Sequence, residues 1–209
     1  MNVIKVILVV VFLNLCACYG YASSRIKLNF DFDWKFSLTD NPGYAAIDYS
    51  DANWEQVQLP HDWNIKQKFD RKGIGSAAYL PEGIGWYRKT FFVPQSYKGK
   101  TVSILFDGIF QQSDVYINGK HLGHRPYGFC SIEYDLTPYL HTGKENVIAV
   151  RVNTTGGRPR WYAGAGIYRH VWLTAANPVH VATYGTYITT PEATEDHADV
   201  KIVTTVSNQ

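Results

Sequence analysis

The run Leu105–Phe129, LFDGIFQQSDVYINGKHLGHRPYGF, carries the strongest local signal for the fold of this chain. Within it, Ser113–Asn118 is rich in β-branched and aromatic residues, as β-strands are. Asn118-Gly119 closes that segment, and this dipeptide favours the primed turn that joins two antiparallel strands. We therefore predict a hairpin in which Ser113–Asn118 pairs with Lys120–Gly123.

Further short segments of the same composition lie on both sides of this hairpin, most of them between Gly, Pro, Asn or Asp residues. They are Trp86–Val93, Thr101–Asp107, Asn146–Asn153 and Tyr168–Thr174. In the second of these, Val102, Ile104 and Phe106 share one face, while Leu105 leaves the other face only partly polar, as in a sandwich strand. Ala45–Val57 is expected to hold at most a helical turn or two. Many short strands with few helices predict an all-β protein, a β-sandwich or jelly roll.

The composition indicates a folded protein and argues against two other classes. The chain has 209 residues, a formal net charge of +2, 45% hydrophobic residues and 18% charged residues. That hydrophobic content is enough for a core, which excludes wholesale disorder. The small net charge, without a block of Lys or Arg, argues against a nucleic-acid partner. A (β/α)₈ barrel needs about 250 residues, so the chain is too short to contain one.

Residues 1–22 are predicted to be an export signal rather than part of the fold. One lysine precedes the apolar run Val6–Leu13, which is too short to span a bilayer as a permanent helix. GYA at 20–22 offers a cleavage site after Ala22. Alternatively, LCAC at 15–18 resembles a bacterial lipobox, in which Cys18 would carry a lipid that anchors the protein to a membrane. Both alternatives predict a periplasmic, secreted or envelope-anchored protein.

Removal of residues 1–22 leaves a single cysteine, Cys130, which has no partner for an internal disulfide. It lies in FCSI at 129–132, an apolar run that looks like a strand. We expect Cys130 to be buried and to serve packing rather than catalysis.

Asn177-Pro178 is predicted to end the first domain, which would comprise residues 23–177. Beyond it, residues 179–190 and Val200–Val206 look like strands on either side of an acidic stretch. Because two strands cannot form an independent domain, residues 178–209 are expected to begin a second sandwich.

Three stretches concentrate aromatic and polar residues outside the plain strand pattern. They are LPHDW at 59–63 with the Gly-rich loop 71–85, HLGHRPYGF at 121–129, and GGRPRWYAGAGIYR at 156–169. Such loops suit sugars, because aromatic faces stack on the apolar face of a sugar and fixed polar groups bond its hydroxyls. The alternative is structural: the glycines support tight turns, and Trp and Arg close the ends of the sandwich.

These stretches resemble the amino-terminal sugar-binding domain of glycoside hydrolase family 2, which contains β-galactosidases, β-glucuronidases and β-mannosidases. The family pattern is followed in order by LPHDW at 59–63, GWYRKTF at 85–91, the run 105–129, YDLTPYL at 134–140 and RWYAGAGIYRHVWL at 160–173. The first two look most like the β-galactosidase-type branch of exported bacterial enzymes. The resemblance implies a galactose-binding-domain-like jelly roll, then an immunoglobulin-like sandwich, then a catalytic barrel outside this chain.

The resemblance also implies the chemistry of that longer enzyme, which is retaining hydrolysis of terminal β-glycosidic bonds by two glutamates. Retention needs two carboxyl groups about 5–5.5 Å apart, one protonated and one ionised. The resemblance places both on the barrel, so no catalytic residue is expected here. Glu82 is the one glutamate in a candidate site loop, and no second carboxylate accompanies it at a recognisable spacing. No cofactor or metal is expected.

What the resemblance assigns to this chain is binding of the terminal sugar, by Tyr79, Arg160 and Trp161. The implied partners are a β-linked oligosaccharide and the downstream domains of the same polypeptide. Some β-galactosidases carry an aspartate near the position of Arg160 that assists sugar and cation binding, and the arginine puts that role and its metal in doubt. Arg160 would instead donate paired hydrogen bonds to hydroxyls or a carboxylate, or would tie its loop to the barrel.

Two histidine motifs invite catalytic or metal-binding interpretations. His61 and Asp62 are adjacent on an extended segment and point to opposite faces, so we favour a structural corner in which Asp62 caps backbone N–H groups. His121 and His124 lie beside the hairpin without an evident third ligand, so a metal site is not expected.

Two functions of other classes compete with the hydrolase interpretation. A free-standing carbohydrate-binding module is disfavoured by the unpaired strand Val200–Val206, and a surface adhesion or assembly domain predicts no sugar contacts. Within the family, a β-glucuronidase or a β-mannosidase is the alternative to a β-galactosidase.

Overall fold

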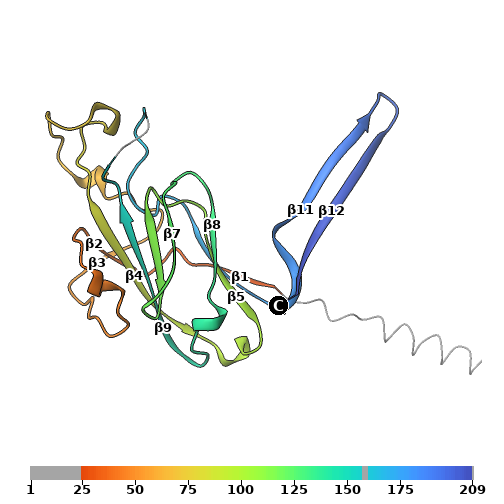
Figure 1. Cartoon of the computed structure of the whole chain (residues 1–209), viewed down its shortest axis with the longest axis horizontal. Coiled ribbons are helices and arrows are strands. Elements are labelled where there is room, and N and C mark those ends of the chain that lie inside the picture. Colours follow the sequence, from red (N-terminus) through yellow and green to blue (C-terminus); the bar gives the residue numbers. More distant parts are fainter. Residues whose placement is uncertain (1–24, 157–159, 209) are drawn as a thin grey trace, which may run out of the picture.

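The structure is all-β, as the sequence predicts. The computed structural model describes residues 25–156 and 160–208, and its only helices there are five short 3-10 turns (Figure 1). These turns are η1 (Pro42–Ala45), η2 (Asn64–Lys66), η3 (Gly75–Ala77), η4 (Gln95–Tyr97) and η5 (Thr137–Tyr139). No helix in the described part of the chain is long and apolar enough to cross a membrane. The predicted export signal, with Cys18, lies outside the described residues.

Two antiparallel sheets face each other and form a β-sandwich. The first has the strand order β1-β10-β5-β8, with β1 (Ile26–Asn29), β10 (Val171–Ala176), β5 (Thr101–Phe106) and β8 (Ile132–Asp135). The second has the order β3-β2-β4-β9-β6-β7, with β3 (Glu55–Val57), β2 (Trp34–Ser37), β4 (Ile84–Val93), β9 (Lys144–Asn153), β6 (Ser113–Ile117) and β7 (Lys120–Arg125).

The predicted hairpin forms where Asn118-Gly119 places it. Strand β6 pairs with β7 in antiparallel register, and both turn residues have positive φ angles, 49° at Asn118 and 79° at Gly119. That left-handed backbone is the one a primed turn requires, and Asn and Gly adopt it at the lowest cost. The turn chemistry therefore fixes the register of the edge hairpin.

The core lies between the two sheets. Val102, Ile104 and Phe106 of β5 are buried on one face, as predicted, and Leu105 on the other face is buried as well. Ring contacts dominate the core near the second sheet, where Phe36 stacks on Trp63 with centroids 5.5 Å apart and Tyr87 lies 4.9 Å from Phe36. Large aromatic side chains supply much of the apolar area that such a core buries.

A buried arginine anchors the long connection from β2 to β3. Arg88 of β4 donates to the carbonyls of Tyr44, Ala46 and Tyr49 and, through Nε, to Oδ2 of Asp51 at 3.1 Å. The prediction for residues 45–57, at most a helical turn or two, agrees with this irregular connection. The 3-10 turn η1 ends at Ala45, where the backbone becomes extended at Ala46 (ψ 141°).

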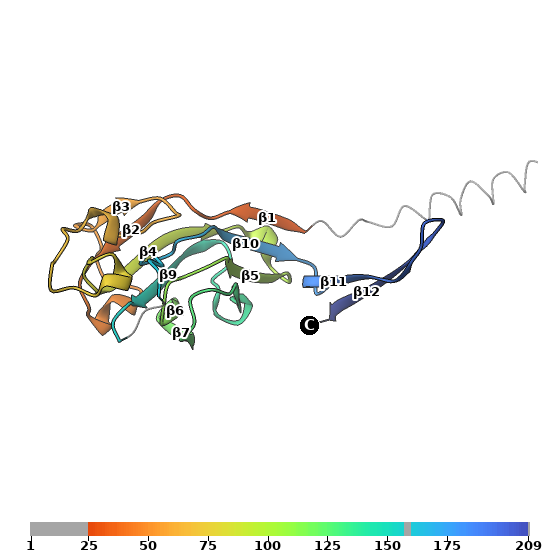
Figure 2. The same cartoon turned by 90° about the horizontal axis from the view of Figure 1, so that it is seen from above.

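The last two strands extend from the body as a hairpin of β11 (Val179–Ala193) and β12 (Ala198–Asn208) (Figure 2). Both faces carry exposed apolar side chains; the central pairs are Tyr187 opposite Val203 and Ile188 opposite Ile202. The predicted domain boundary at Asn177-Pro178 falls in the connection between β10 and β11.

Replacing Arg88 with Met is expected to destabilise the fold by about 3–5 kcal/mol, because it leaves Asp51 and three carbonyls without their buried donor. Urea unfolding of the full chain measures the loss. Lys35→Met is the matched control, since Lys35 contacts the same carboxylate from the surface at 2.7 Å and its removal should cost at most about 1 kcal/mol. Equal losses in the two variants would contradict the anchoring role of Arg88.

Asp40 should contribute to stability in a pH-dependent way. Its hydrogen bonds from Arg151 hold the pKa of the carboxyl below the ordinary 3.8, against the opposing effect of partial burial. A lowered pKa in the folded state gives stability that is present above the unfolded value and lost as the pH falls through the folded value. Asp40→Asn should therefore be less stable than the parent at neutral pH and indistinguishable from it at about pH 2.

Urea unfolding at both pH values measures this difference. The exposed Asp48, replaced by Asn, serves as the control and should keep the parent's pH dependence. A stability gap for Asp40→Asn that persists unchanged in acid would refute the assignment.

Candidate functional site

Three connecting loops gather at one end of the sandwich, and the stretches singled out in the sequence lie in them or, for residues 84–85 and 121–125, in the adjoining strands β4 and β7. They are the β3–β4 connection (58–83), the β7–β8 connection (126–131) and the described parts of the β9–β10 connection (154–156 and 160–170) (Figure 1). The first of these loops lies at the end of the molecule away from the β11–β12 hairpin (Figure 2). Rigid strands thus present loops of mixed aromatic and polar character, a common arrangement for a binding site.

Asp62 joins the first loop to the third. Its Oδ1 accepts hydrogen bonds from the backbone N–H of Asn64 at 2.9 Å and of Ala165 at 3.1 Å, and its Oδ2 accepts the hydroxyl of Tyr162. The backbone N–H of Trp63 also donates to the carbonyl of Ala165 at 3.1 Å. The prediction that Asp62 caps backbone N–H groups is confirmed, and the cap connects segments about one hundred residues apart in the sequence.

His61 lies behind this junction and does not form an acid/base pair with Asp62. Its Nδ1 and the hydroxyl of Tyr87 share a hydrogen bond of 2.9 Å. Burial lowers the pKa of His61, and the nearby Lys66 lowers it further, so the imidazole is neutral at neutral pH. Burial also raises the pKa of Tyr87 well above its ordinary range, so that hydroxyl keeps its proton. The pair therefore forms a neutral buried bond beneath the loops.

Gly166 lets the third loop approach this buried pair. A Cβ at this position would lie 2.2 Å from the Tyr87 hydroxyl and 2.7 Å from the carbonyl of His61, and the φ angle is +123°. Only glycine combines that backbone conformation with so close a contact. The packing of the two loops thus requires glycine at position 166.

Tyr79 lies on the first loop, in a turn where two consecutive residues have left-handed backbone conformations. Ala78 and Tyr79 have φ angles of 54° and 58°, and the carbonyl of Tyr79 accepts the backbone N–H of Asp70 at 2.8 Å. The Tyr79 ring is half exposed and borders an open cavity of about 380 Å³ that is also lined by Phe69, Arg71 and Ala78. Tyr79 is therefore available to a ligand.

Arg160 and Trp161 lie on the third loop and are both exposed. The indole of Trp161 is 61% exposed, and its nearest ring partner is Phe129 of the second loop, with centroids 6.4 Å apart. Tyr79 borders a cavity with Phe69 and Arg71 rather than with Trp161. The three predicted residues thus share one end of the fold, with Tyr79 on one loop and Arg160 and Trp161 on another.

The structure adds two aromatic residues to this end that the sequence reasoning did not select. Tyr127 and Phe129 of the second loop are exposed, and their ring centroids lie 5.6 Å apart. The stretch HLGHRPYGF had been singled out as a whole. The signal that could have identified these two rings is their place after Pro126, beyond the alternating pattern of β7, where a side chain is no longer assigned to a sheet face.

Cys130 is exposed, so the prediction of a buried packing role is wrong. The apolar run that suggested a strand is divided in the structure, because β8 begins only at Ile132. Cys130 therefore belongs to the second loop, where its Sγ lies 3.9 Å from the carbonyl of Tyr127.

His121 and His124 converge on a residue of the neighbouring strand. Their Nε2 and Nδ1 atoms lie 3.0 and 3.1 Å from the same Oδ1 of Asp114, and Arg151 approaches the other carboxylate oxygen at 3.9 Å. The Asp114 carboxylate thus already has the Arg151 guanidinium as an ion-pair partner and hydrogen bonds with both imidazoles. Strand pairing brought in Asp114, which the sequence spacing could not reveal.

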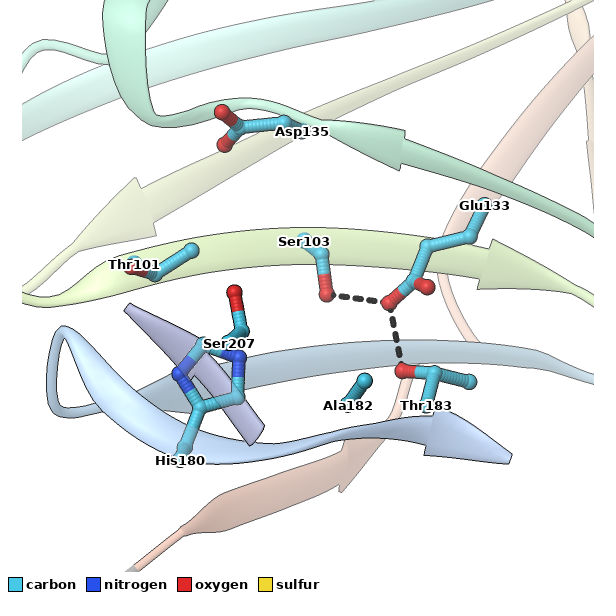
Figure 3. Close-up of a pocket in the computed structure, with 8 residues that line it drawn as sticks. All are labelled: Thr101, Ser103, Glu133, Asp135, His180, Ala182, Thr183 and Ser207. Atoms are coloured by element: carbon cyan, nitrogen blue, oxygen red, sulfur yellow. Dashed lines mark hydrogen bonds between the residues drawn. The ribbon is translucent and has the colours of Figure 1, made fainter. Parts of the chain in front are cut away.

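A second concavity, of about 300 Å³, lies where the β11–β12 hairpin meets the first sheet (Figure 3). Its lining is formed by Thr101, Ser103, Glu133, Asp135, His180, Ala182, Thr183 and Ser207. In it, Oε1 of Glu133 accepts the hydroxyls of Ser103 at 2.8 Å and Thr183 at 2.7 Å. Glu133 therefore ties the hairpin to the body. Because its lining holds no Trp, Tyr or Phe ring on which a sugar could stack, the loop end is the better candidate for a sugar site.

Comparison with known proteins identifies the domain. Residues 27–177 match the sequence model of the family described as "Glycosyl hydrolases family 2, sugar binding domain". The "Beta-galactosidase BoGH2A" of Bacteroides ovatus is 45% identical over 201 residues, covering 94% of this chain and 24% of that protein. A "Beta-glucuronidase" of Formosa agariphila is 38% identical, covering 90% of this chain and 22% of that protein.

Solved structures give the same result. A β-glycosidase from Bacteroides vulgatus superposes with a TM-score of 0.83 at 40% identity, covering 88% of this chain and 24% of that chain. A β-glucuronidase from glycoside hydrolase family 2 superposes with a TM-score of 0.80 at 36% identity, covering 90% of this chain and 22% of that chain. The chain thus spans about a quarter of the length of these relatives. Since the family match covers the whole sandwich, the chain belongs to glycosyl hydrolase family 2, and its residues 27–177 form the sugar binding domain of that family.

Proposed function

We propose that the chain is the sugar-binding and scaffold portion of an exported family 2 glycoside hydrolase of the β-galactosidase type. The parent enzyme would hydrolyse terminal β-glycosidic bonds with retention, and this portion would help to hold the terminal sugar. The observation that carries the proposal is an exposed tryptophan beside an arginine, Trp161 and Arg160, on a loop that Asp62 fixes in place. The relative named a β-galactosidase, at 45% identity, supports the choice of branch.

The three predicted residues would make different kinds of contact with the sugar. The exposed face of Trp161 would stack on the apolar face of a sugar ring, and the Arg160 guanidinium would donate paired hydrogen bonds to hydroxyls. Tyr79 would close the opposite side of the site from its own loop. Asp62 would not touch the sugar, because both of its oxygens already accept hydrogen bonds from the loops.

The catalytic carboxyl pair would belong to another part of the enzyme. Retention needs two carboxyl groups about 5–5.5 Å apart, one of them held protonated. Here Glu55 is paired with Lys66, and Glu133 accepts two hydroxyls beside the hairpin. These carboxylates have structural partners at other places in the fold, which supports a binding role for the loop end.

The β11–β12 hairpin supports a multidomain parent over a free-standing carbohydrate-binding module. Its exposed apolar side chains on both faces, such as Tyr187 and Ile188, suit a strand pair that is covered by further strands. We therefore propose that residues 178–209 open an immunoglobulin-like sandwich. Export through residues 1–22, with either cleavage after Ala22 or lipidation of Cys18, belongs to the same proposal.

Sugar binding by the full chain tests the proposal. Calorimetric titration with methyl β-galactoside should show millimolar or tighter affinity. Arg160→Ala should weaken it roughly ten- to a hundredfold, since a hydrogen bond from a charged group contributes about 1.5–3 kcal/mol. Lys98→Ala, at an exposed site in the β4–β5 connection, is the control and should bind like the parent.

The same titration with methyl β-glucuronide and methyl β-mannoside ranks the alternatives within the family. The isolated chain should not hydrolyse nitrophenyl β-galactoside. Absence of binding to all three glycosides would count against the proposal and in favour of an adhesion or assembly domain, and measurable hydrolysis would show that the catalytic pair lies in this chain.

Asp62→Ala should loosen the third loop and weaken sugar binding without removing any group that contacts the sugar. The variant loses the acceptor for the Ala165 N–H and the Tyr162 hydroxyl, so we expect faster amide hydrogen exchange in residues 160–170 and a drop in affinity of roughly tenfold. Tyr162→Phe, which removes one of those donors, should show a smaller change in both measurements. An affinity loss with unchanged exchange in the loop would contradict this positioning role.

A further inference from the structure

Three exposed aromatic rings form a continuous row across the second and third loops. The row consists of Tyr127, Phe129 and Trp161, of which the two end rings are 61% exposed and the middle ring is 40% exposed. Centroid distances are 5.6 Å from Tyr127 to Phe129 and 6.4 Å from Phe129 to Trp161. The planes of neighbouring rings are inclined by 70° and 48°, so the row is twisted rather than flat.

The row is held in place from beneath. Phe129 packs against the buried Phe110, with centroids 5.3 Å apart. A Cβ at Gly128 would lie 2.6 Å from the ring of Phe110, so only glycine allows the loop this close, and the Tyr168 hydroxyl donates to the Gly128 carbonyl at 2.9 Å. Rings that are ordered before binding lose little conformational entropy when a ligand arrives.

The aromatic row and the family match together favour a sugar chain as the ligand of this surface. In the second and third loops, the exposed large apolar side chains of described residues 126–131 and 160–170 are all aromatic (Tyr127, Phe129, Trp161 and Tyr162), whereas the first loop also exposes Ile65 and Ile74. Protein interfaces are also enriched in aromatic residues and arginine, so it is the match of residues 27–177 to a sugar binding domain that favours a sugar over a protein partner. Aromatic faces alone, beside the hydrogen-bond donors of Arg160, match the alternating apolar faces and hydroxyl edges of sugars.

We infer that the aromatic row binds the sugar units that follow the terminal one, so that the ligand is a chain of β-linked sugars rather than a disaccharide. The inference rests on the proposed function, because Trp161 belongs both to the proposed terminal-sugar site and to the row. The chain would run from Arg160 and Trp161 over Phe129 to Tyr127. The twist of the row suits a glycan chain whose successive rings rotate about its axis.

The experiment compares disaccharides with tetrasaccharides on the full chain. Isothermal titration uses β-1,4-linked galactose, glucose, xylose and mannose oligomers of both lengths. At least one series should show the tetrasaccharide binding roughly three- to tenfold more tightly, the increment expected for stacking on a further ring. Tyr127→Ala should reduce that increment and leave disaccharide affinity unchanged, whereas Phe129→Ala should weaken the binding of both lengths, because the second sugar unit would lie on Phe129. Phe92→Ala, which removes a similarly exposed ring on β4, should keep it.

The possible outcomes distinguish failure of the aromatic row from failure of the terminal-sugar site. Disaccharide binding without any gain on lengthening, or a gain that survives Tyr127→Ala, overturns the role of the row and leaves the terminal-sugar site standing. If no oligosaccharide series binds, both the role of the aromatic row and the proposed terminal-sugar site are refuted. If the row instead joins two copies of the chain, sedimentation velocity will show a dimer that Tyr127→Ala dissociates, which also overturns the inference.

Discussion

The candidate site depends on the hydrogen bonds that the carboxylate of Asp62 accepts. This carboxylate connects the LPHDW segment after β3 to the GAGIY segment before β10, and it does so with hydrogen bonds to backbone N–H groups and to the Tyr162 hydroxyl. Charge-assisted hydrogen bonds of this kind are stronger than neutral ones. The neutral His61–Tyr87 pair and the glycine at position 166 allow the two segments to approach closely beneath it. Without this junction, backbone hydrogen bonds of Ala165, Gly166 and Ile167 would still hold the loop, but the segment next to Trp161 would lose the acceptor of the Tyr162 hydroxyl and of the Ala165 N–H.

Much of the fold follows from short-range sequence patterns. The Asn118-Gly119 turn, the strands rich in β-branched and aromatic residues, and the buried face of β5 needed only local backbone chemistry and a period of two. Local patterns failed where distant segments decide the structure. Cys130 is exposed and falls outside the strand that its apolar neighbours suggested, because β8 begins only at Ile132.

In the candidate site, too, local sequence predicts some features and only the tertiary fold decides others. Asp62 was predicted to cap backbone groups because an aspartate in a turn does so by its own geometry, whereas the identity of its partner, Ala165, depends on the tertiary fold. For Tyr127 and Phe129 the sequence holds only an indirect signal, their place after Pro126 and beyond the alternating pattern of β7, because a loop has no periodicity of its own that assigns a ring to the surface. Asp114 became the partner of His121 and His124 only through the pairing of β6 with β7.

The central claim is that the loop end of the sandwich, rather than the crevice at the β11–β12 hairpin, receives the sugar. The most direct measurement is nuclear magnetic resonance of the isotope-labelled full chain, following backbone amide shifts during titration with a β-linked tetrasaccharide that binds. The account predicts that the shifted amides cluster in residues 61–83, 126–131 and 160–166. Shifts that cluster instead around Ser103, Glu133 and Thr183 would contradict it.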